Sequence, residues 1–249
     1  MSTAKNHNEL ENQKEAAIVA VEGYLDALIA SSDPADHGRA DKLCYWMKDY
    51  MRFLGYEKQF SPKKLRRYKR GEIIKVHLGY NIGSEEGGLH YAVVLDRNNA
   101  ISNPVITIVP LTSVKSTTDI GSLRPTRVYL GNELFTNLSS KISYMSQELN
   151  KKIDELEDMV ADGGHDKDEM KAKLLIAKSE LRLVEKTSRE ISRLKQGSIA
   201  LTDQITTISK IRIYDPRTDH DVLSKVKLSN EKLDLIDAAI KENILGPKS

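Results

Sequence analysis

Between residues 138 and 194, apolar side chains recur at steps of three and four, with a break at Asp162-Gly163-Gly164. The repeat consists of Leu138, Ile142, Met145, Leu149, Ile153, Leu156 and Val160 before the break, and Met170, Leu174, Ala177, Leu181, Val184, Ile191 and Leu194 after it. This spacing predicts an antiparallel coiled-coil hairpin with arms of about 20 residues, each roughly 30 Å long. Because such a hairpin buries its own seam, the strands on either side of it are expected to form one sheet.

Strand patterns lie both before and after this hairpin. Residues 74–78 alternate apolar with polar side chains, and 91–95 form a continuous apolar run of buried-strand length. In all, strands are expected at 74–78, 91–95, 104–112, 127–130, 198–202 and 206–213, followed by a helix capped by Ser229. About five or six short antiparallel strands predict a small barrel that the last helix closes on one side, which is an α+β fold.

The first 62 residues carry a helical pattern of their own. One helix is expected to end near Ser31-Ser32, and a second to begin at Asp33-Pro34, where aspartate can cap the helix and proline suits its first position. The predicted division is a helical extension (1–62), the first part of the barrel (63–137), the coiled-coil insertion (138–195), and the second part of the barrel with its C-terminal helix (196–249).

Composition limits the class of protein. With 249 residues, 39% of them hydrophobic, the chain can bury a sizeable core, and 30% charged residues suit long solvated helices. A net charge of +2 is too small to indicate nucleic acid by itself. Cys44 is the only cysteine, so an internal disulfide is impossible. No secretory signal or long apolar run is present, and we expect a cytoplasmic protein that does not enter a membrane.

The loop between the first two strands collects the polar groups that a site requires. Glycines at 83, 87 and 88 allow positive φ and close approach of a ligand. Ser84, Glu85 and His90 offer a hydroxyl, a carboxylate and an imidazole at its rim. Taken alone, a glycine-rich segment between two strands is more often only a connection.

A basic run precedes the first strand. Residues 63–70 read KKLRRYKR, in which Lys64 and Arg67 are candidate phosphate contacts and Tyr68 could stack on a base. A solvated linker explains the same run equally well.

Three blocks carry a resemblance to a known family. They are RGEIIKVHLGYNIGSEEGGLHYAVVLD, ITIVPLTS and GSIALTDQITTISKIRI, and together they cover about 100 residues, from Tyr68 to Thr117 and from Gln196 to the C-terminal helix. Their order and spacing resemble those of the MazF/PemK toxins of type II toxin–antitoxin systems. The N-terminal helices and the predicted coiled coil fall outside the resemblance.

The resemblance implies an SH3-like barrel that forms a homodimer, binds a cognate antitoxin and cleaves single-stranded RNA without a metal or cofactor. The ribose 2′-hydroxyl would attack its own 3′-phosphate, which requires a base, an acid and donors to the phosphate oxygens. His90 stands where the family usually has arginine; imidazole can serve as base, acid or phosphate donor. Thr112 matches the family's threonine, and Ser113 follows it as a second hydroxyl donor.

The third block departs from the family pattern. Asp203-Gln204 matches an acidic-Gln pair, but Thr206 replaces an arginine that commonly follows, so guanidinium charge is lost from the site. Strand alternation would place Lys210 and Arg212 on the face of Thr206, though both could equally be surface charges. The predicted catalytic residues are His90 and Thr112, and the predicted RNA-binding residues are Ser84, Glu85, Gly87, Gly88, Ser113, Gln204, Thr206, Lys210, Arg212, Lys64 and Arg67.

Two other functions are consistent with the same residues. A non-catalytic binder on this barrel, either a degenerate toxin that still binds RNA or a gyrase poison of the CcdB type, would need no acid or base. A coiled-coil scaffold would use the barrel only as structure. Cleavage of purified RNA distinguishes the nuclease from both.

Overall fold

The computed structural model describes residues 6–163, 166–195 and 197–246, and it divides into two compact units at Lys58/Gln59. The first unit consists of α1 (His7–Ala30) and α2 (Pro34–Glu57). Asn6 forms a capping box with Glu9, so α1 begins within the polar N-terminal segment. The predicted start of the second helix is confirmed, because the Asp33 carboxylate accepts a hydrogen bond from Ala35 N–H and Pro34 is the first helical residue.

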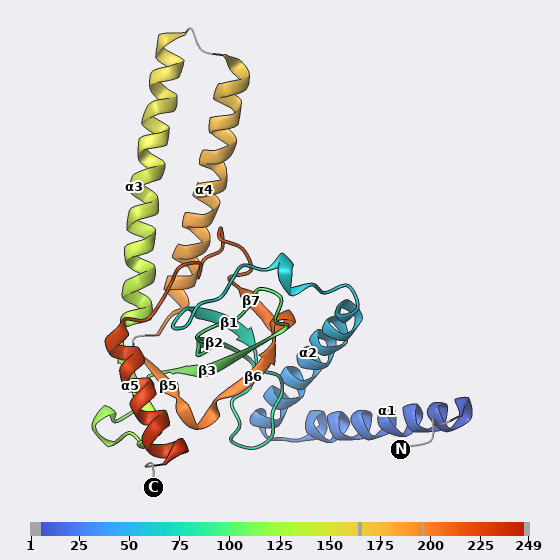
Figure 1. Ribbon diagram of the computed structural model, residues 1–249. Helices are drawn as coiled ribbons and strands as arrows, with labels where there is room; N and C mark the ends of the chain where they lie inside the picture. Colours follow the sequence, from blue (N-terminus) through green and yellow to red (C-terminus); the bar gives the residue numbers. More distant parts are fainter. Residues whose placement is uncertain (1–5, 164–165, 196, 247–249) are drawn as a thin grey trace. The chain divides into compact units, whose positions relative to one another are not determined.

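The second unit is built on an antiparallel sheet, which with the helices confirms the α+β class (Figure 1). The strands of the described chain are β1 (Ile73–His77), β2 (Leu89–Val94), β3 (Val105–Ser113), β4 (Arg127–Gly131), β5 (Ser198–Leu201), β6 (Thr206–Ser209) and β7 (Ile213–Asp215). Their order is β4-β5-β3-β2-β1-β7. The long strand β3 pairs with β2 along one edge, and along the other it pairs first with β6 and then with β5.

A single turn of 3₁₀-helix joins β6 to β7. Ser209 caps this turn, Lys210–Arg212, through its side chain, and so the strand predicted at 206–213 is two strands on opposite sides of a corner. Because β6 pairs with β3 and β7 pairs with β1, the path β6-β3-β2-β1-β7 returns to its start through this turn. The chain thereby encloses the interior face of these strands.

Apolar side chains are buried on both faces of the sheet. The enclosed face contains Ile74, Val76, Ala92, Val94, Ile106, Ile108, Ile208 and Ile213. On the other face, Ile73, Val93 and Val109 pack with residues of α5 (Asn230–Ile240), including Leu233 and Ile236. Ser229 caps this helix, as predicted. Ile244 lies beyond the end of α5 and is exposed.

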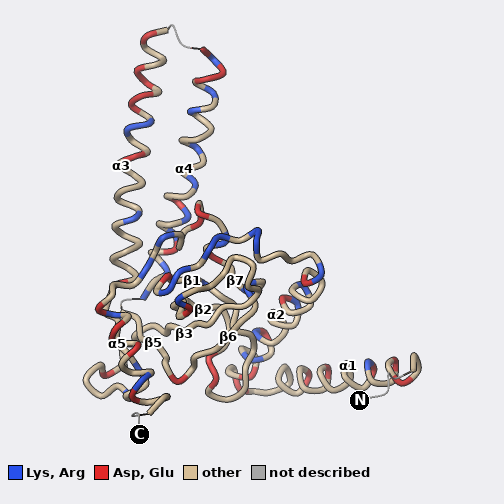
Figure 2. The backbone as a smooth tube through the Cα atoms, viewed as in Figure 1, with Lys and Arg blue, Asp and Glu red and all other residues tan. Residues whose placement is uncertain are grey.

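Two long helices separate the halves of the sheet. They are α3 (Glu133–Asp162) and α4 (Lys167–Arg193), with 30 and 27 residues, so both arms are longer than the predicted 20. They run side by side away from the sheet in Figure 1, and acidic and basic residues are interspersed along both in Figure 2. Gly163 ends α3 in the left-handed conformation; Gly164 of the predicted turn lies outside the described residues.

The base of this helical pair belongs to the core of the sheet. Leu134 and Leu138 of α3 are buried in the same cluster as Val93 and Val109, and Leu183, Ile191 and Leu194 pack against it. Glu190 of α4 also accepts hydrogen bonds from Lys75 on β1 and Tyr91 on β2. Burial alone would raise the pKa of Glu190, but these two donors lower it. The expectation that the hairpin buries only its own seam is therefore wrong at its base.

Shortening the hairpin at its outer end should leave the fold intact. Lys152 and Glu180 form an ion pair across the two arms, so a short Gly/Ser turn can replace residues 152–180. We expect this variant to melt cooperatively by circular dichroism. By contrast, Leu138→Ala should lower the free energy of unfolding by about 2–5 kcal/mol, because Leu138 is fully buried at the base. Loss of the cooperative melt in the shortened protein would show that the outer arms are needed for folding.

Candidate functional site

The two predicted catalytic residues come from neighbouring strands. Ala92 on β2 pairs with Pro110 on β3, and continuing this register by two residues sets His90 opposite Thr112. His90 shares a strand face with Ala92 and Val94, which are buried in the enclosed core. Both His90 and Thr112 are partly exposed, so they lie where this core opens to solvent.

Both ring nitrogens of His90 lie close to hydrogen-bond acceptors. Nδ1 is 3.2 Å from the carbonyl oxygen of Leu111, and Nε2 is 3.1 Å from Oε1 of Glu86. The carbonyl oxygen of Leu111 can only accept, so this hydrogen bond requires a proton on Nδ1. This contact fixes the orientation of the ring and turns Nε2 toward the loop that carries Glu86.

The shape of the loop depends on glycine. The Gly79 carbonyl accepts a hydrogen bond from Gly88 N–H at 2.6 Å, and a Cβ on Gly87 would lie 2.9 Å from that same oxygen. Gly88 has φ of +85°, which side chains rarely adopt. Together these contacts fold the loop back over the end of β1, which brings Glu86 to His90.

Gln204 holds the same loop from the other half of the sheet. Its side-chain oxygen accepts from Glu86 N–H at 3.2 Å, and its amide nitrogen donates to the Ser84 carbonyl at 3.2 Å. The amide of Gln204, predicted to contact RNA, is thus bonded to backbone. Glu85, the residue before Glu86, is exposed, and its carboxylate accepts a hydrogen bond from Ile82 N–H.

The other predicted hydroxyl residues lie along β3 and β6. Thr206 pairs with Ile108, which lies four residues before Thr112 on β3, so it faces the same side of the sheet as Thr112. Ser113 is the last residue of β3 and is exposed. The structure therefore places the threonines on one side of β3, with Ser113 at its end.

Lys210 does not face the site. It is 1% exposed, and its ammonium group donates to the Ala100 carbonyl at 3.1 Å and lies 5.9 Å from the centre of the Tyr68 ring. Burial lowers the pKa of Lys210. The 3₁₀ turn at 210–212 interrupts the strand on which the sequence placed Lys210, and the buried side chain is not exposed for a contact with RNA.

Arg212 lies closer to the loop than Lys210 does. Its Nε donates to the carbonyl of His77 at 2.7 Å, at the end of β1. The next residues of the chain begin the loop that carries Glu86. Arg212 is therefore a cation beside the site, although the same turn removes it from the strand on which the sequence placed it.

Figure 2 marks the Lys and Arg positions of the chain in blue, and some of those in the run before β1 form contacts within the fold. Arg66 binds both oxygens of Glu72, at 2.9 and 3.0 Å, and Arg70 pairs with Asp237. Tyr68 is 1% exposed and donates to the Pro216 carbonyl, so it cannot stack on a base. The exposed basic residues of the run are Lys63, Lys64, Arg67 and Lys69.

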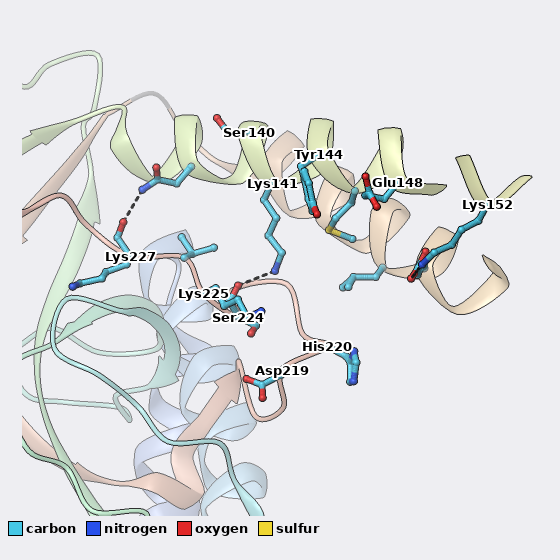
Figure 3. Close-up of a pocket in the computed structure, with 15 residues that line it drawn as sticks. Ser140, Lys141, Tyr144, Glu148, Lys152, Asp219, His220, Ser224, Lys225 and Lys227 are labelled. Carbon is cyan, nitrogen blue, oxygen red and sulfur yellow. Dashed lines mark hydrogen bonds and ion pairs between the residues drawn. The ribbon is translucent and has the colours of Figure 1, made fainter. Parts of the chain in front are cut away.

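A separate cavity of about 660 Å³ lies between the hairpin base and the segment 219–227 (Figure 3). Lys141 reaches across from α3 and donates to the carbonyls of Asp221, Val222 and Ser224. Burial lowers the pKa of Lys141 to about 8. None of the predicted site residues lines this cavity. Lys141 links α3 to the segment 219–227 through its three hydrogen bonds.

The arrangement around His90 is suited to proton transfer. Imidazole and carboxylate are in contact and about a quarter exposed, at 25% and 23%, and a threonine hydroxyl lies across the strand pair. The sequence analysis missed Glu86 as a site residue. The position of Glu86, four residues before His90 and next to two glycines, could have indicated the contact. Strand alternation could not predict it, because Glu86 lies in a loop and not on a strand.

The described helices include none that is long and apolar enough to cross a membrane. A comparison with curated proteins gave no match. A family model, described as a PemK-like, MazF-like toxin of a type II toxin–antitoxin system, matches residues 69–162. The matched stretch runs from β1 to the end of α3, so it includes the first arm of the hairpin, whereas the block at 197–213 lies outside it. Residues 69–162 of this chain are therefore similar to PemK-like, MazF-like toxins of type II toxin–antitoxin systems.

Proposed function

We propose that this protein is the toxin of a type II toxin–antitoxin pair and that it cleaves single-stranded RNA on an SH3-like barrel. The observation that carries the proposal is the His90 ring. It is oriented by the Leu111 carbonyl, set opposite Thr112 and partly exposed, all within the stretch that matches the toxin family. Histidine in such a position can move a proton near neutral pH.

The proposed reaction is an internal transfer at phosphorus. The 2′-hydroxyl loses its proton and attacks the adjacent phosphate, and the 5′-oxygen leaves with a proton. His90 supplies acid–base chemistry, while the hydroxyl of Thr112 donates to a phosphate oxygen. Arg212, at the end of β1, is the nearby cation that can offset part of the charge lost with the family's arginines.

RNA binding would draw on the exposed basic residues before β1. Lys63, Lys64 and Arg67 are exposed, and contacts of this kind to phosphates bind every sequence alike. We propose a homodimer and a cognate antitoxin as partners, with the cytoplasm as the place of action. Ser84 and Glu85, exposed on the loop, are proposed to contact the RNA beside the cleaved bond.

The proposal is tested by incubating purified protein with a defined RNA in the presence of a chelator. We expect cleavage of single-stranded regions, protection of the same sequence in a duplex, and no effect of the chelator. The absence of cleavage on several long natural RNAs, by protein that melts cooperatively, would overturn the nuclease proposal and favour a binding function.

A further inference from the structure

We infer that Glu86 is the second acid–base residue of this site and that it works as a pair with His90. The inference rests on the proposed RNA cleavage and adds a residue to it. A reaction that begins at the 2′-hydroxyl needs a group that accepts a proton as well as one that donates it. The sequence analysis assigned acid–base chemistry to His90 alone.

The contacts of the ring place His90 and Glu86 within hydrogen-bond distance of each other. Nδ1 faces the Leu111 carbonyl at 3.2 Å, and Nε2 faces the Glu86 carboxylate at 3.1 Å. A carbonyl and an ionised carboxylate are both acceptors, so both contacts are satisfied when each ring nitrogen carries a proton. The geometry therefore sets a possible proton donor, Nε2, against a possible proton acceptor, the Glu86 carboxylate.

Glu86 is held in place by its backbone, which leaves its carboxylate available. Its N–H donates to Gln204 at 3.2 Å and its carbonyl accepts from Asn81 at 2.7 Å, both independently of the side chain. The carboxylate is 23% exposed beside His90 at 25%. Substrate can therefore reach both groups, and a change of the side chain need not release the loop.

The pair completes the proposed reaction with all atoms accounted for. The Glu86 carboxylate takes the proton of the 2′-hydroxyl as the bond between that oxygen and phosphorus forms. The bond from phosphorus to the 5′-oxygen breaks, and His90 Nε2 gives its proton to the departing oxygen. The products are a 2′,3′-cyclic phosphate and a 5′-hydroxyl. Proton transfer from Glu86 to His90 across their contact restores the starting state without any other reactant.

The experiment compares kcat and KM for cleavage of one RNA by four proteins. Glu86→Gln keeps the backbone contacts but cannot accept a proton, and it should lower kcat by about 10²-fold with little change in KM. Glu86→Asp keeps a carboxylate and should recover part of the loss. Glu231→Gln is the control for net charge, because Glu231 is 80% exposed on α5, and it should match the parent.

Combining Glu86→Gln with His90→Ala tests whether the two act as a unit. The double variant should be little slower than the slower single variant, since either change alone disables the pair. Cleavage by the parent together with an unchanged kcat in Glu86→Gln would overturn the inference and leave the nuclease proposal standing. A rise in KM alone would assign Glu86 to RNA binding and overturn it as well. An inactive parent protein would instead contradict the nuclease proposal itself.

Discussion

Replacing His90 by alanine should lower the rate of RNA cleavage by about 10²-fold or more, which is the usual size for loss of a general acid or base. The change removes the ring that lies between the Leu111 carbonyl and Glu86, and no other described contact restores a proton donor there. RNA affinity should change far less, because phosphate contacts lie on other residues. Single-turnover cleavage and a binding titration on the same RNA measure the two effects separately.

Thr112→Val is the matched change on the facing strand. Valine keeps the shape and the strand preference of threonine but removes the hydroxyl, so a comparable loss of rate is expected if that hydroxyl donates to the phosphate. If His90→Ala cleaved at the parent rate while Thr112→Val were inactive, the catalyst would lie elsewhere. Arg212 would then be the next candidate, whereas Lys210 is buried against the Ala100 carbonyl.

Arg66→Met should lower the free energy of unfolding by about 3–5 kcal/mol. Arg66 and Glu72 are only 9% and 7% exposed, and the guanidinium binds both carboxylate oxygens. Removing the arginine leaves a buried carboxylate whose remaining described partner is the Lys69 N–H. Urea unfolding, followed by circular dichroism, measures the change.

The double variant Arg66→Met, Glu72→Leu is the control for this prediction. It removes both charges and replaces them with apolar groups, so it should be closer in stability to the parent than the single variant is. Equal stability of the single variant and the parent would show that the pair is solvated in the folded protein.

Local rules predicted the starts of α2 and α5 correctly. Asp33-Pro34 and Ser229 begin helices because a side-chain oxygen must satisfy the first free backbone N–H groups wherever a helix starts. They also located β1 and β2 around the glycine loop, because alternation and apolar runs depend only on neighbouring residues. These features of the fold are encoded within a few residues.

The errors arise where distant residues decide the structure. The corner at Ser209 ends the predicted strand before Lys210, and a pattern of alternation cannot reveal it. Tyr68 looked like a stacking residue in a basic run, but its hydroxyl donates a hydrogen bond to the carbonyl of Pro216, far along the chain. The contact of Glu86 with His90 likewise depends on Gln204, which holds the loop from beyond the hairpin.

The most direct test of the central claim is the chemistry of the cut RNA ends, measured by mass spectrometry of the products of a short single-stranded RNA. Internal attack by the 2′-hydroxyl, with His90 as an acid–base group, predicts a 2′,3′-cyclic phosphate on one fragment and a 5′-hydroxyl on the other, formed in the presence of a chelator. Fragments that carry a 5′-phosphate, or an RNA that stays intact, would contradict the account.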